Sequence, residues 1–348
     1  MAAPGEPLRG ALIGCGFFAI NQLEAWREIE GAKIVAICDR DAARLAEVGD
    51  RFGIASRHVD AAAMLKTETL DFVDIATTPP SHRALVELAS SHGLDAICQK
   101  PIASSLADAR AMVASADMAG TMLTVHENFR WQRPIRQVRR ALDRGAIGSP
   151  FWGRVSFRSG YDVYAGQPYL ATGERFIIED LGIHILDIAR FLFGEVRSLA
   201  ARTQRVNPRI RGEDVATMLL DHEGGVHSVV DCSYATRTER DPFPETLIEI
   251  DGTEGSLRLG QDYRLVLTRP DGTTEEDASP VLPVWGSKPW HNIQESVRAL
   301  QEDWVAAKRE GRRPETNGHD NLRTFALVEA AYRSAGTGAV VPLGDGAA

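Results

Sequence analysis

The chain has 348 residues, of which 44% are hydrophobic and 25% are charged, a composition typical of globular proteins and a length that suggests two domains. Its formal net charge is -9, and it has no block of basic residues. These properties argue against nucleic acid or an anionic membrane surface as a partner and favour a small molecule.

The four cysteines have no CxxC spacing and the histidines do not cluster, so we predict neither a metal site nor a disulfide framework. No segment approaches the roughly 18 apolar residues of a membrane helix, and the start of the chain does not resemble a secretory signal. We therefore expect a cytoplasmic protein, with its small-residue tails at 2–5 and 344–348 frayed.

From residue 8 to residue 126, short apolar runs alternate with stretches that carry apolar residues at helical spacing. This alternation predicts a doubly wound parallel sheet with helices on both faces. The expected strands are 11–13, 34–38, 72–75, 96–98 and 122–125, and the expected helices are 18–30, 42–51, 81–91 and 104–118.

The pattern changes after residue 125 to runs separated by turn signals such as Asp251-Gly252 and Asp271-Gly272, which predicts antiparallel pairing. The expected strands are 152–159, 199–206, 215–221, 226–233, 246–251, 256–259 and 263–268, and the expected helices are 134–144, 181–193, 293–310 and 321–334.

The fold class is therefore α/β, with an N-terminal parallel sheet followed by an α+β domain whose large, open, mainly antiparallel sheet is backed by helices. We place the domains at 1–126 and 127–348, and the last helix can pack back on the first domain. Because an open sheet is a natural surface for pairing subunits, we expect a homodimer or homotetramer formed through this sheet.

A glycine-rich loop, Gly14-Cys15-Gly16-Phe17-Phe18-Ala19, directly follows the first expected strand and opens the first helix. This is the position of the dinucleotide-binding fingerprint of the Rossmann fold. Gly14 permits the tight turn, Gly16 lets the backbone approach a pyrophosphate, and the loop continues through Phe17 and Phe18 into a helix whose N-terminus favours phosphate. A simple glycine turn is the alternative.

Asp39 ends the second expected strand about 20 residues beyond the loop, where a carboxylate can hold the ribose hydroxyls of the cofactor. A carboxylate there repels a 2′-phosphate, so we favour NAD, although Arg40 could support NADP. Two alternatives stay open: Asp39 could cap the helix that begins near Asp41, and a methyltransferase has a similar loop and acid.

Three motifs resemble those of the glucose-fructose oxidoreductase and inositol dehydrogenase (Gfo/Idh/MocA) family, and the resemblance covers nearly the whole chain. They are Thr77-Thr78-Pro79-Pro80-Ser81-His82, Gln99-Lys100-Pro101 and Glu179-Asp180-Leu181-Gly182-Ile183-His184-Ile185-Leu186-Asp187. The ending Leu327-Val328-Glu329-Ala330-Ala331-Tyr332-Arg333-Ser334-Ala335 is also similar. The resemblance implies a nicotinamide cofactor in the Rossmann half and a substrate between that half and the open sheet.

The resemblance also implies roles for single residues. Lys100 matches a lysine that contacts the substrate and orients it, and at the carboxyl edge of a parallel sheet it would point toward bound ligands. Gln99 stands where the family usually has glutamate. The remaining cofactor contacts expected from these motifs are Thr77, Thr78, Pro79 and His82, although His82 suits a structural role at the helix start better.

Asp180 and His184 are one helical turn apart, so both can face the substrate from the start of one helix. Oxidation of an alcohol needs a base for the hydroxyl proton, and histidine titrates in the useful range. The resemblance assigns this role to His184, with Asp180 contacting the substrate or tuning the imidazole. Asp187 could instead orient the ring. The alternative to a catalytic role is that His184 is a structural histidine, buried in the core with its hydrogen bonds satisfied.

Further substrate contacts are expected where the two halves join and just beyond. Asn128, Arg130 and Trp131 are the leading candidates, although a purely structural joint explains them as well. Arg158 and Tyr161 are weaker candidates.

Together these features predict an NAD(P)-dependent oxidoreductase that transfers a hydride between nicotinamide and a sugar, a polyol or a related hydroxy or keto compound, with Lys100, Asp180 and His184 as catalytic residues. Two alternatives use the same scaffold: a regulator that senses dinucleotides without chemistry, and an enzyme that cleaves glycosides with the help of bound NAD.

Overall fold

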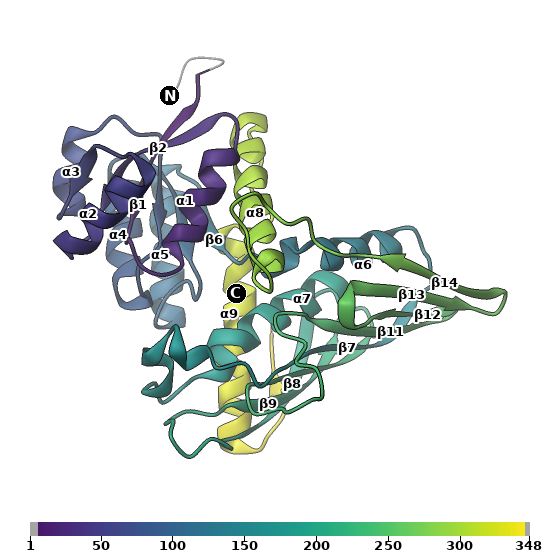
Figure 1. Cartoon of the computed structure of the whole chain (residues 1–348). Helices are drawn as coiled ribbons and strands as arrows, with labels where there is room; N and C mark the ends of the chain where they lie inside the picture. The colour runs from purple at the N-terminus through teal and green to yellow at the C-terminus, as the bar shows by residue number, and fades with distance from the viewer. Residues whose placement is uncertain (1–5, 345–348) are drawn as a thin grey trace. The chain divides into compact units, whose positions relative to one another are not determined.

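The computed structural model describes residues 6–344, and they form two compact units (Figure 1). Of the described residues, the first unit contains 6–127 and 297–322, and the second contains 128–296 and 323–344. The division by function at residue 126 stays a prediction. The tails expected to be frayed are 2–5 and 344–348, and all of these residues except Gly344 lie outside the described residues.

The first unit contains a six-stranded parallel sheet in the order β3-β2-β1-β4-β5-β6, the strand order of a Rossmann fold. Its strands are β1 (Leu8–Ile13), β2 (Ala32–Cys38), β3 (Ser56–His58), β4 (Phe72–Ile75), β5 (Asp95–Gln99) and β6 (Leu123–His126). Its helices are α1 (Ala19–Glu28), α2 (Ala42–Phe52), α3 (Ala61–Thr67), α4 (Pro79–Ser91) and α5 (Leu106–Ala119), joined by most of α8 (His291–Glu310) and the first turn of α9 (Gly318–Thr337).

Helix α8 is part of the hydrophobic core of the first unit. Trp304 of α8 lies with its ring centre 4.5 Å from that of Phe72 on β4 and 6.1 Å from that of Trp26 on α1. Phe72 and Trp304 are fully buried. Helix α8, which lies close to the C-terminal end of the chain, therefore stabilises the unit that contains the N-terminal sheet.

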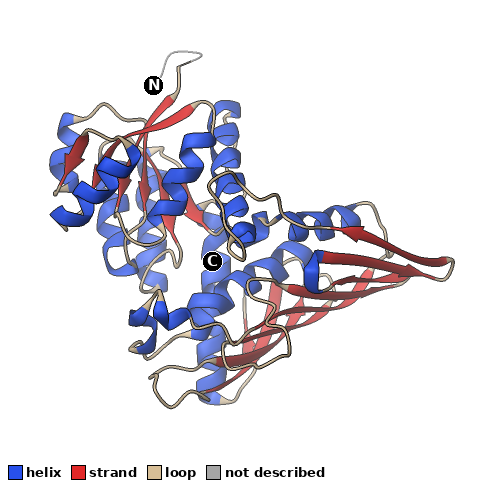
Figure 2. Ribbon diagram, in the orientation of Figure 1, coloured by secondary structure: helices blue, strands red, loops and turns tan. Residues whose placement is uncertain are grey.

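The second unit contains a large sheet, whose strands are red in Figure 2. Its nine strands have the order β14-β13-β12-β11-β7-β10-β9-β8-β15, and among them only β7 and β10 pair in parallel. Its strands are β7 (Pro150–Arg158), β8 (Val196–Gln204), β9 (Val215–His222), β10 (His227–Ser233), β11 (Leu247–Gly252), β12 (Gly255–Leu259), β13 (Arg264–Arg269), β14 (Gly272–Asp277) and β15 (Val341–Pro342). Helices α6 (Arg133–Asp143), α7 (Ile183–Phe193) and most of α9 belong to the same unit, and α7 packs against β7 and β10.

The predicted fold class is confirmed, with corrections to individual elements. Strands β3, β14 and β15 and helix α3 were not predicted. The helix expected at 181–193 starts earlier, as a π-helical turn (Ile178–Gly182) that leads into α7.

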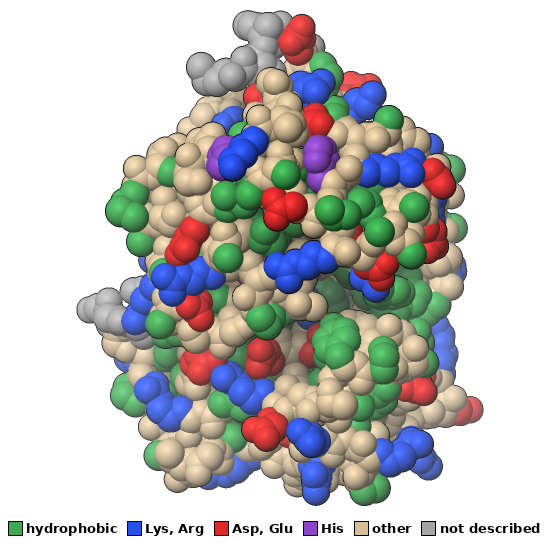
Figure 3. Space-filling view, turned by 90° about the vertical axis from the view of Figure 1, so that its left-hand side faces the viewer, with side chains coloured by type: hydrophobic (Ala, Val, Ile, Leu, Met, Phe, Trp, Pro, Cys, Tyr) green, Lys and Arg blue, Asp and Glu red, His purple; other side chains and the backbone are tan. Residues whose placement is uncertain are grey.

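Basic and acidic side chains are interspersed on the surface that Figure 3 presents, in keeping with 39 Lys and Arg against 48 Asp and Glu. Between residues 6 and 344, the structure contains no helix that is long and apolar enough to cross a membrane.

Candidate functional site

The glycine-rich loop lies where β1 and β4 end side by side, at the switch point of the parallel sheet. Gly14 has a φ of +98°, and a Cβ on it would lie 2.9 Å from the backbone of Ala76. A Cβ on Gly16, in contrast, would have no atom within 4 Å. The space above Gly16 is therefore open to a ligand, and any larger side chain would occupy it.

Helix α1 begins directly after this loop and has no side-chain N-cap. Its first amide groups and its positive dipole end can therefore bind an anionic group such as a pyrophosphate. Phe17, in the same loop, is 53% exposed.

Asp39 joins the glycine-rich loop to the end of β2. One carboxylate oxygen, Oδ2, accepts a hydrogen bond from the Cys15 amide (2.7 Å), and Oδ1 accepts one from the Asp41 amide (2.8 Å). The cap of α2 is Asp41, whose side chain accepts hydrogen bonds from the amides of Ala43 and Arg44. The alternative in which Asp39 caps that helix is therefore wrong.

Together, the open loop, the uncapped helix and a carboxylate at the end of β2 could hold a dinucleotide, and the contact of its pyrophosphate with the loop and of its adenosine ribose with Asp39 stays a prediction. Arg40 is exposed beside Asp39, and Arg44 reaches Asp39 Oδ2 at 3.9 Å.

His82 is fully buried and connects the two loops that follow β4 and β5. Its Nε2 lies 3.1 Å from the carbonyl oxygen of Thr77, and its Nδ1 lies 3.1 Å from those of Pro101 and Ile102. Burial lowers the pKa of His82, which favours the neutral ring. These contacts give His82 a structural position between the predicted cofactor loops.

Lys100 is half-buried at the end of β5, and its backbone amide donates a hydrogen bond to the Gln99 side-chain oxygen (2.8 Å). Gln99 thus holds the backbone at Lys100.

The motif Thr77–His82 contains an internal hydrogen bond, in which the Ser81 hydroxyl donates to Thr77 Oγ1 (2.8 Å). Thr78 is exposed and Pro79 is half-buried at the start of α4.

In the second unit, Asp180 lies in the π-helical turn and His184 in the first turn of α7. Asp180 is half-buried, whereas His184 is 4% exposed and its ring stacks on that of Phe129. Single π-helical turns are rare and are found frequently at functional sites. Asp180 also affects Tyr234: burial first, and then the Asp180 carboxylate, raise the pKa of the Tyr234 phenol well above 10.

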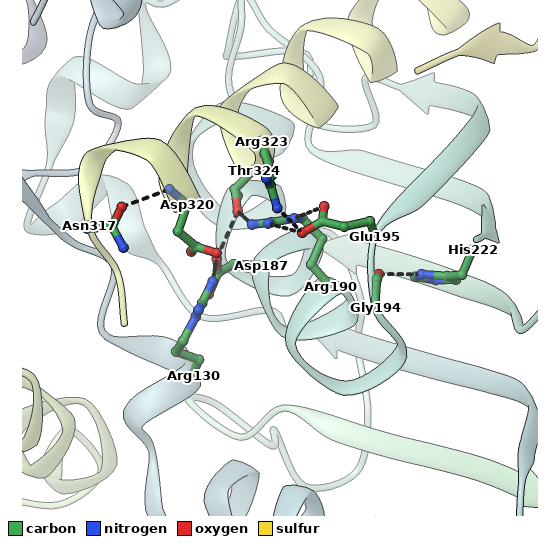
Figure 4. Close-up of polar contacts among 10 residues, drawn as sticks. All are labelled: Arg130, Asp187, Arg190, Gly194, Glu195, His222, Asn317, Asp320, Arg323 and Thr324. Carbon is green, nitrogen blue, oxygen red and sulfur yellow. Dashed lines mark hydrogen bonds and ion pairs between the residues drawn. The ribbon is translucent and has the colours of Figure 1, made fainter. Parts of the chain in front are cut away.

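Arg130 forms a buried ion pair with Asp187, through Nε to Oδ2 (2.7 Å) and Nη2 to Oδ1 (2.5 Å) (Figure 4). The Thr324 hydroxyl of α9 donates to the same carboxylate (2.8 Å) and accepts from Arg190 Nη1 (2.7 Å). The chain of contacts continues from Arg190 to Glu195. It ties α7 to α9 and to the turn that carries Phe129.

The other candidate substrate contacts also lie in the second unit. Asn128 is buried and donates from Nδ2 to Ser296 Oγ (2.6 Å), and the Arg136 guanidinium covers the ring of Trp131 at 4.4 Å. Arg158 lies 3.8 Å from Asp231, and Tyr161 stacks on Phe243. The roles of all these residues stay predictions.

The structure thus groups Lys100 with the predicted cofactor residues in the first unit, and Asp180 with His184 in the second. Sequence reasoning missed Phe129 and Tyr234, which lie in the surroundings of His184 and Asp180. Phe129 lies between the predicted contacts Asn128 and Arg130 in the sequence, whereas nothing in the sequence marks Tyr234.

Comparison with known proteins identifies the family. Residues 8–127 match an oxidoreductase family with an NAD-binding Rossmann fold, and residues 135–258 match the GFO/IDH/MocA C-terminal domain. The chain is 63% identical to the D-apiose dehydrogenase of Rhizobium rhizogenes over 97% of this chain and 98% of that protein. It is also 63% identical to the D-apiose dehydrogenase of Paraburkholderia graminis, over 96% of this chain and 89% of that protein.

A solved structure is also similar to this chain over nearly its whole length. An oxidoreductase from Agrobacterium radiobacter, in complex with NAD⁺, L-tartaric acid and magnesium, has a TM-score of 0.95 and 63% identity to this chain, covering 96% of it and 98% of that chain. Relatives that are named dehydrogenases do not favour the sensing regulator or the glycoside-cleaving enzyme. The protein is an NAD-binding oxidoreductase that transfers a hydride between nicotinamide and a sugar or a related compound, and its chain belongs to the GFO/IDH/MocA family.

Proposed function

We propose that the protein is an NAD⁺-dependent D-apiose dehydrogenase. The observation that carries this proposal is the 63% identity to a D-apiose dehydrogenase over 97% of the chain. Oxidation at the anomeric carbon is the expected reaction, and a relative at 26% identity, from Haloferax volcanii, is named a D-xylose 1-dehydrogenase. Loss of a hydride from that carbon and of a proton from its hydroxyl converts the ring form of the sugar into a lactone.

When bound, NAD⁺ supplies the hydride acceptor. His184 takes the proton from the hydroxyl oxygen of the reacting carbon, because it is the one histidine of the Asp180–Asp187 motif and an imidazole can act as a general base. Asp180 accepts a hydrogen bond from another sugar hydroxyl and keeps the sugar in place. The Lys100 ammonium group donates to a substrate oxygen and orients the reacting carbon. This division of roles assigns cofactor binding and the Lys100 contact to residues 1–126, and the other substrate contacts to residues 127–348.

Subunit pairing through the nine-stranded sheet is part of the proposal. On the sheet face opposite α7, Arg154 lies 2.7 Å from Asp231 and 3.5 Å from Glu249, while Leu219 is 55% exposed on the neighbouring strand β9. A surface that mixes both charges with apolar side chains can complement itself about a two-fold axis. Light scattering of Leu219→Glu, compared with the parent protein, tests this: pairing predicts dissociation, and an unchanged mass contradicts pairing through this face.

The four cysteines are free and buried. Free cysteines are typical of proteins in a reducing compartment. Burial raises the pKa of Cys15 to about 12 and that of Cys38 to about 11, and this disfavours their thiolates. The free, buried cysteines support a cytoplasmic location, which fractionation of the cells would test.

A substrate panel tests the proposed reaction. We would measure NADH formation from NAD⁺ with D-apiose, D-xylose, myo-inositol and scyllo-inositol at equal concentrations. The proposal predicts the highest kcat/KM for D-apiose and a lactone as the product. A higher kcat/KM for an inositol would contradict the assigned substrate while leaving the oxidoreductase activity intact.

A further inference from the structure

The π-helical turn that carries Asp180 is held by two residues that are distant in the sequence. We propose that Glu213 and Tyr332 are positioning residues that clamp this turn and thereby fix Asp180 with respect to His184. The inference rests on the proposed function, because that function gives Asp180 its contact with the substrate.

Glu213 binds the backbone that leads into the turn. Its carboxylate oxygen Oε1 lies 3.2 Å from the Phe176 amide nitrogen and 3.3 Å from that of Ile178, and its own carbonyl oxygen accepts from the Ile177 amide (3.1 Å). One residue thus satisfies three successive amides. These are the groups that a helix leaves without partners at its N-terminus, where a negative charge is also favourable.

Tyr332 of α9 contacts both Glu213 and the backbone of the π-helical turn. Its hydroxyl donates to Glu213 Oε1 (2.7 Å) and accepts from the Glu179 amide (3.3 Å), next to Asp180 in the chain. Burial first, and then the Glu213 carboxylate, raise the pKa of Tyr332, so the hydroxyl keeps the proton that it donates.

Arg175 fixes the phenol ring of Tyr332. Its guanidinium lies 3.9 Å above the ring centre, with Nη2 2.6 Å from Glu329 and Nε 3.3 Å from Glu179. Tyr332 and Glu329 both belong to the ending motif that we noted in the sequence, 327–335, and to which the proposed reaction assigns no role. The clamp gives this motif a function.

The clamp matters because a π-helical turn is not the default geometry of a helix. Without outside partners, the segment would relax toward the α-helical hydrogen bonds of α7 and change the direction of Asp180 relative to His184. A misplacement of about 1 Å at a reacting centre can lower the rate about 100-fold. Glu213 and Tyr332 therefore act on catalysis through the backbone of the turn.

Tyr332→Phe tests the inference, since it removes both hydroxyl contacts and keeps the ring beneath Arg175. We expect kcat/KM for D-apiose to fall by about 10- to 100-fold, while the Kd for NADH, whose predicted site lies in the other unit, stays within about 2-fold. Glu213→Ala should have a similar effect. Glu213→Gln keeps an oxygen acceptor and should retain most of the activity.

The matched control is Ser334→Ala, two residues further along α9. Ser334 is fully buried, and its hydroxyl accepts from the Ala201 amide (2.9 Å) and donates to the Ala339 carbonyl (2.7 Å), so this variant also loses two buried hydrogen bonds. It should lower Tm about as much as Tyr332→Phe and leave kcat/KM unchanged. Equal losses of activity in the two variants, or a Tyr332→Phe variant as active as the parent, would overturn the inference.

Hydrogen exchange separates failure of this inference from failure of the proposed function. Exchange of the amides of residues 176–180 should become at least about 10-fold faster in Tyr332→Phe, but not in Ser334→Ala. Unchanged exchange would show that the clamp does not hold the turn. A parent protein that exchanges as expected but does not oxidise D-apiose would instead contradict the proposed substrate.

Discussion

The ring of Phe129 lies parallel to that of His184, with 3.8 Å between the ring centres and 7° between the planes. Aromatic pairs contribute about 0.5–1.5 kcal/mol beyond their burial, enough to favour one orientation of the imidazole. Phe129 belongs to the short 3-10 turn Phe129–Trp131, and the buried Arg130–Asp187 ion pair ties that turn to α7. The orientation of His184 thus depends on a segment that lies about 55 residues earlier in the chain.

The first prediction concerns proton transfer by His184. Replacement by alanine should lower kcat by about 10²- to 10⁴-fold, the usual contribution of a general base. Phe129→Leu should lower kcat by a smaller factor, because the base remains but loses its stacking partner. Both variants should bind NADH as the parent does, which fluorescence titration can check. An unchanged kcat in His184→Ala would contradict the assignment of His184 as the general base.

The second prediction separates a structural role of Arg130 from a substrate contact. Arg130→Ala leaves the Asp187 carboxylate buried without its cation, which costs about 3–5 kcal/mol in the free energy of unfolding. Removing both partners, in Arg130→Ala with Asp187→Ala, should cost less than the sum of the single changes. Urea unfolding measures these values. Parent-like stability together with a greatly raised KM would indicate that Arg130 instead binds the sugar.

The third prediction concerns cofactor choice. Asp39→Ala removes the carboxylate that repels a 2′-phosphate, so the ratio of NADPH to NADH affinity should rise at least about 10-fold. Asp41→Ala is the matched control, because it removes the cap of α2 two residues away and should leave this ratio unchanged. If both variants kept the parent's ratio in fluorescence titrations, Asp39 would not determine cofactor choice.

The fourth prediction is a dependence of stability on pH that arises from Asp74 on β4. This residue is fully buried and accepts hydrogen bonds from Gln22 Nε2 and Trp26 Nε1 (both 2.8 Å). Burial raises the pKa of Asp74 from 3.8 to about 7, even though the two hydrogen bonds lower it. The folded protein therefore keeps a proton on Asp74 at pH values where the unfolded chain has released it.

This stabilising effect is fully present below about pH 4 and is lost as the pH rises through about 7. Relative to Asp74→Asn, which cannot ionise, the parent should lose on the order of 4 kcal/mol of unfolding free energy between pH 4 and pH 8. Urea unfolding followed by tryptophan fluorescence measures this difference. A difference that does not change with pH would show that Asp74 ionises normally in the folded protein.

The sequence predicts the fold class because the apolar periodicity switches near residue 125. It misses the elements whose residues carry no such periodicity. Strand β14 is exposed at all six positions, so it shows no apolar alternation, and β3 is only three residues long. Both are added to a sheet by hydrogen bonds to a neighbouring strand, which composition does not reveal.

The sequence predicts only those parts of the candidate site that short, local motifs encode. The glycine-rich loop and Asp39 are recognisable because their spacing follows from one strand-helix-strand unit. The π-helical turn before α7 is not, because it depends on Glu213 and Tyr332, which lie about 30 and 150 residues further along the chain. Likewise, Asp187 looks like a partner for His184 in the sequence, and the structure places it against Arg130 and Thr324.

The most direct test of the account uses D-apiose that carries deuterium at the anomeric carbon. Direct hydride transfer predicts that the deuterium moves to the nicotinamide ring, that one reduced cofactor forms per sugar oxidised, and that His184→Ala slows the transfer. Reduced cofactor without deuterium, or release of product with no reduced cofactor, would contradict direct oxidation of this sugar by the protein.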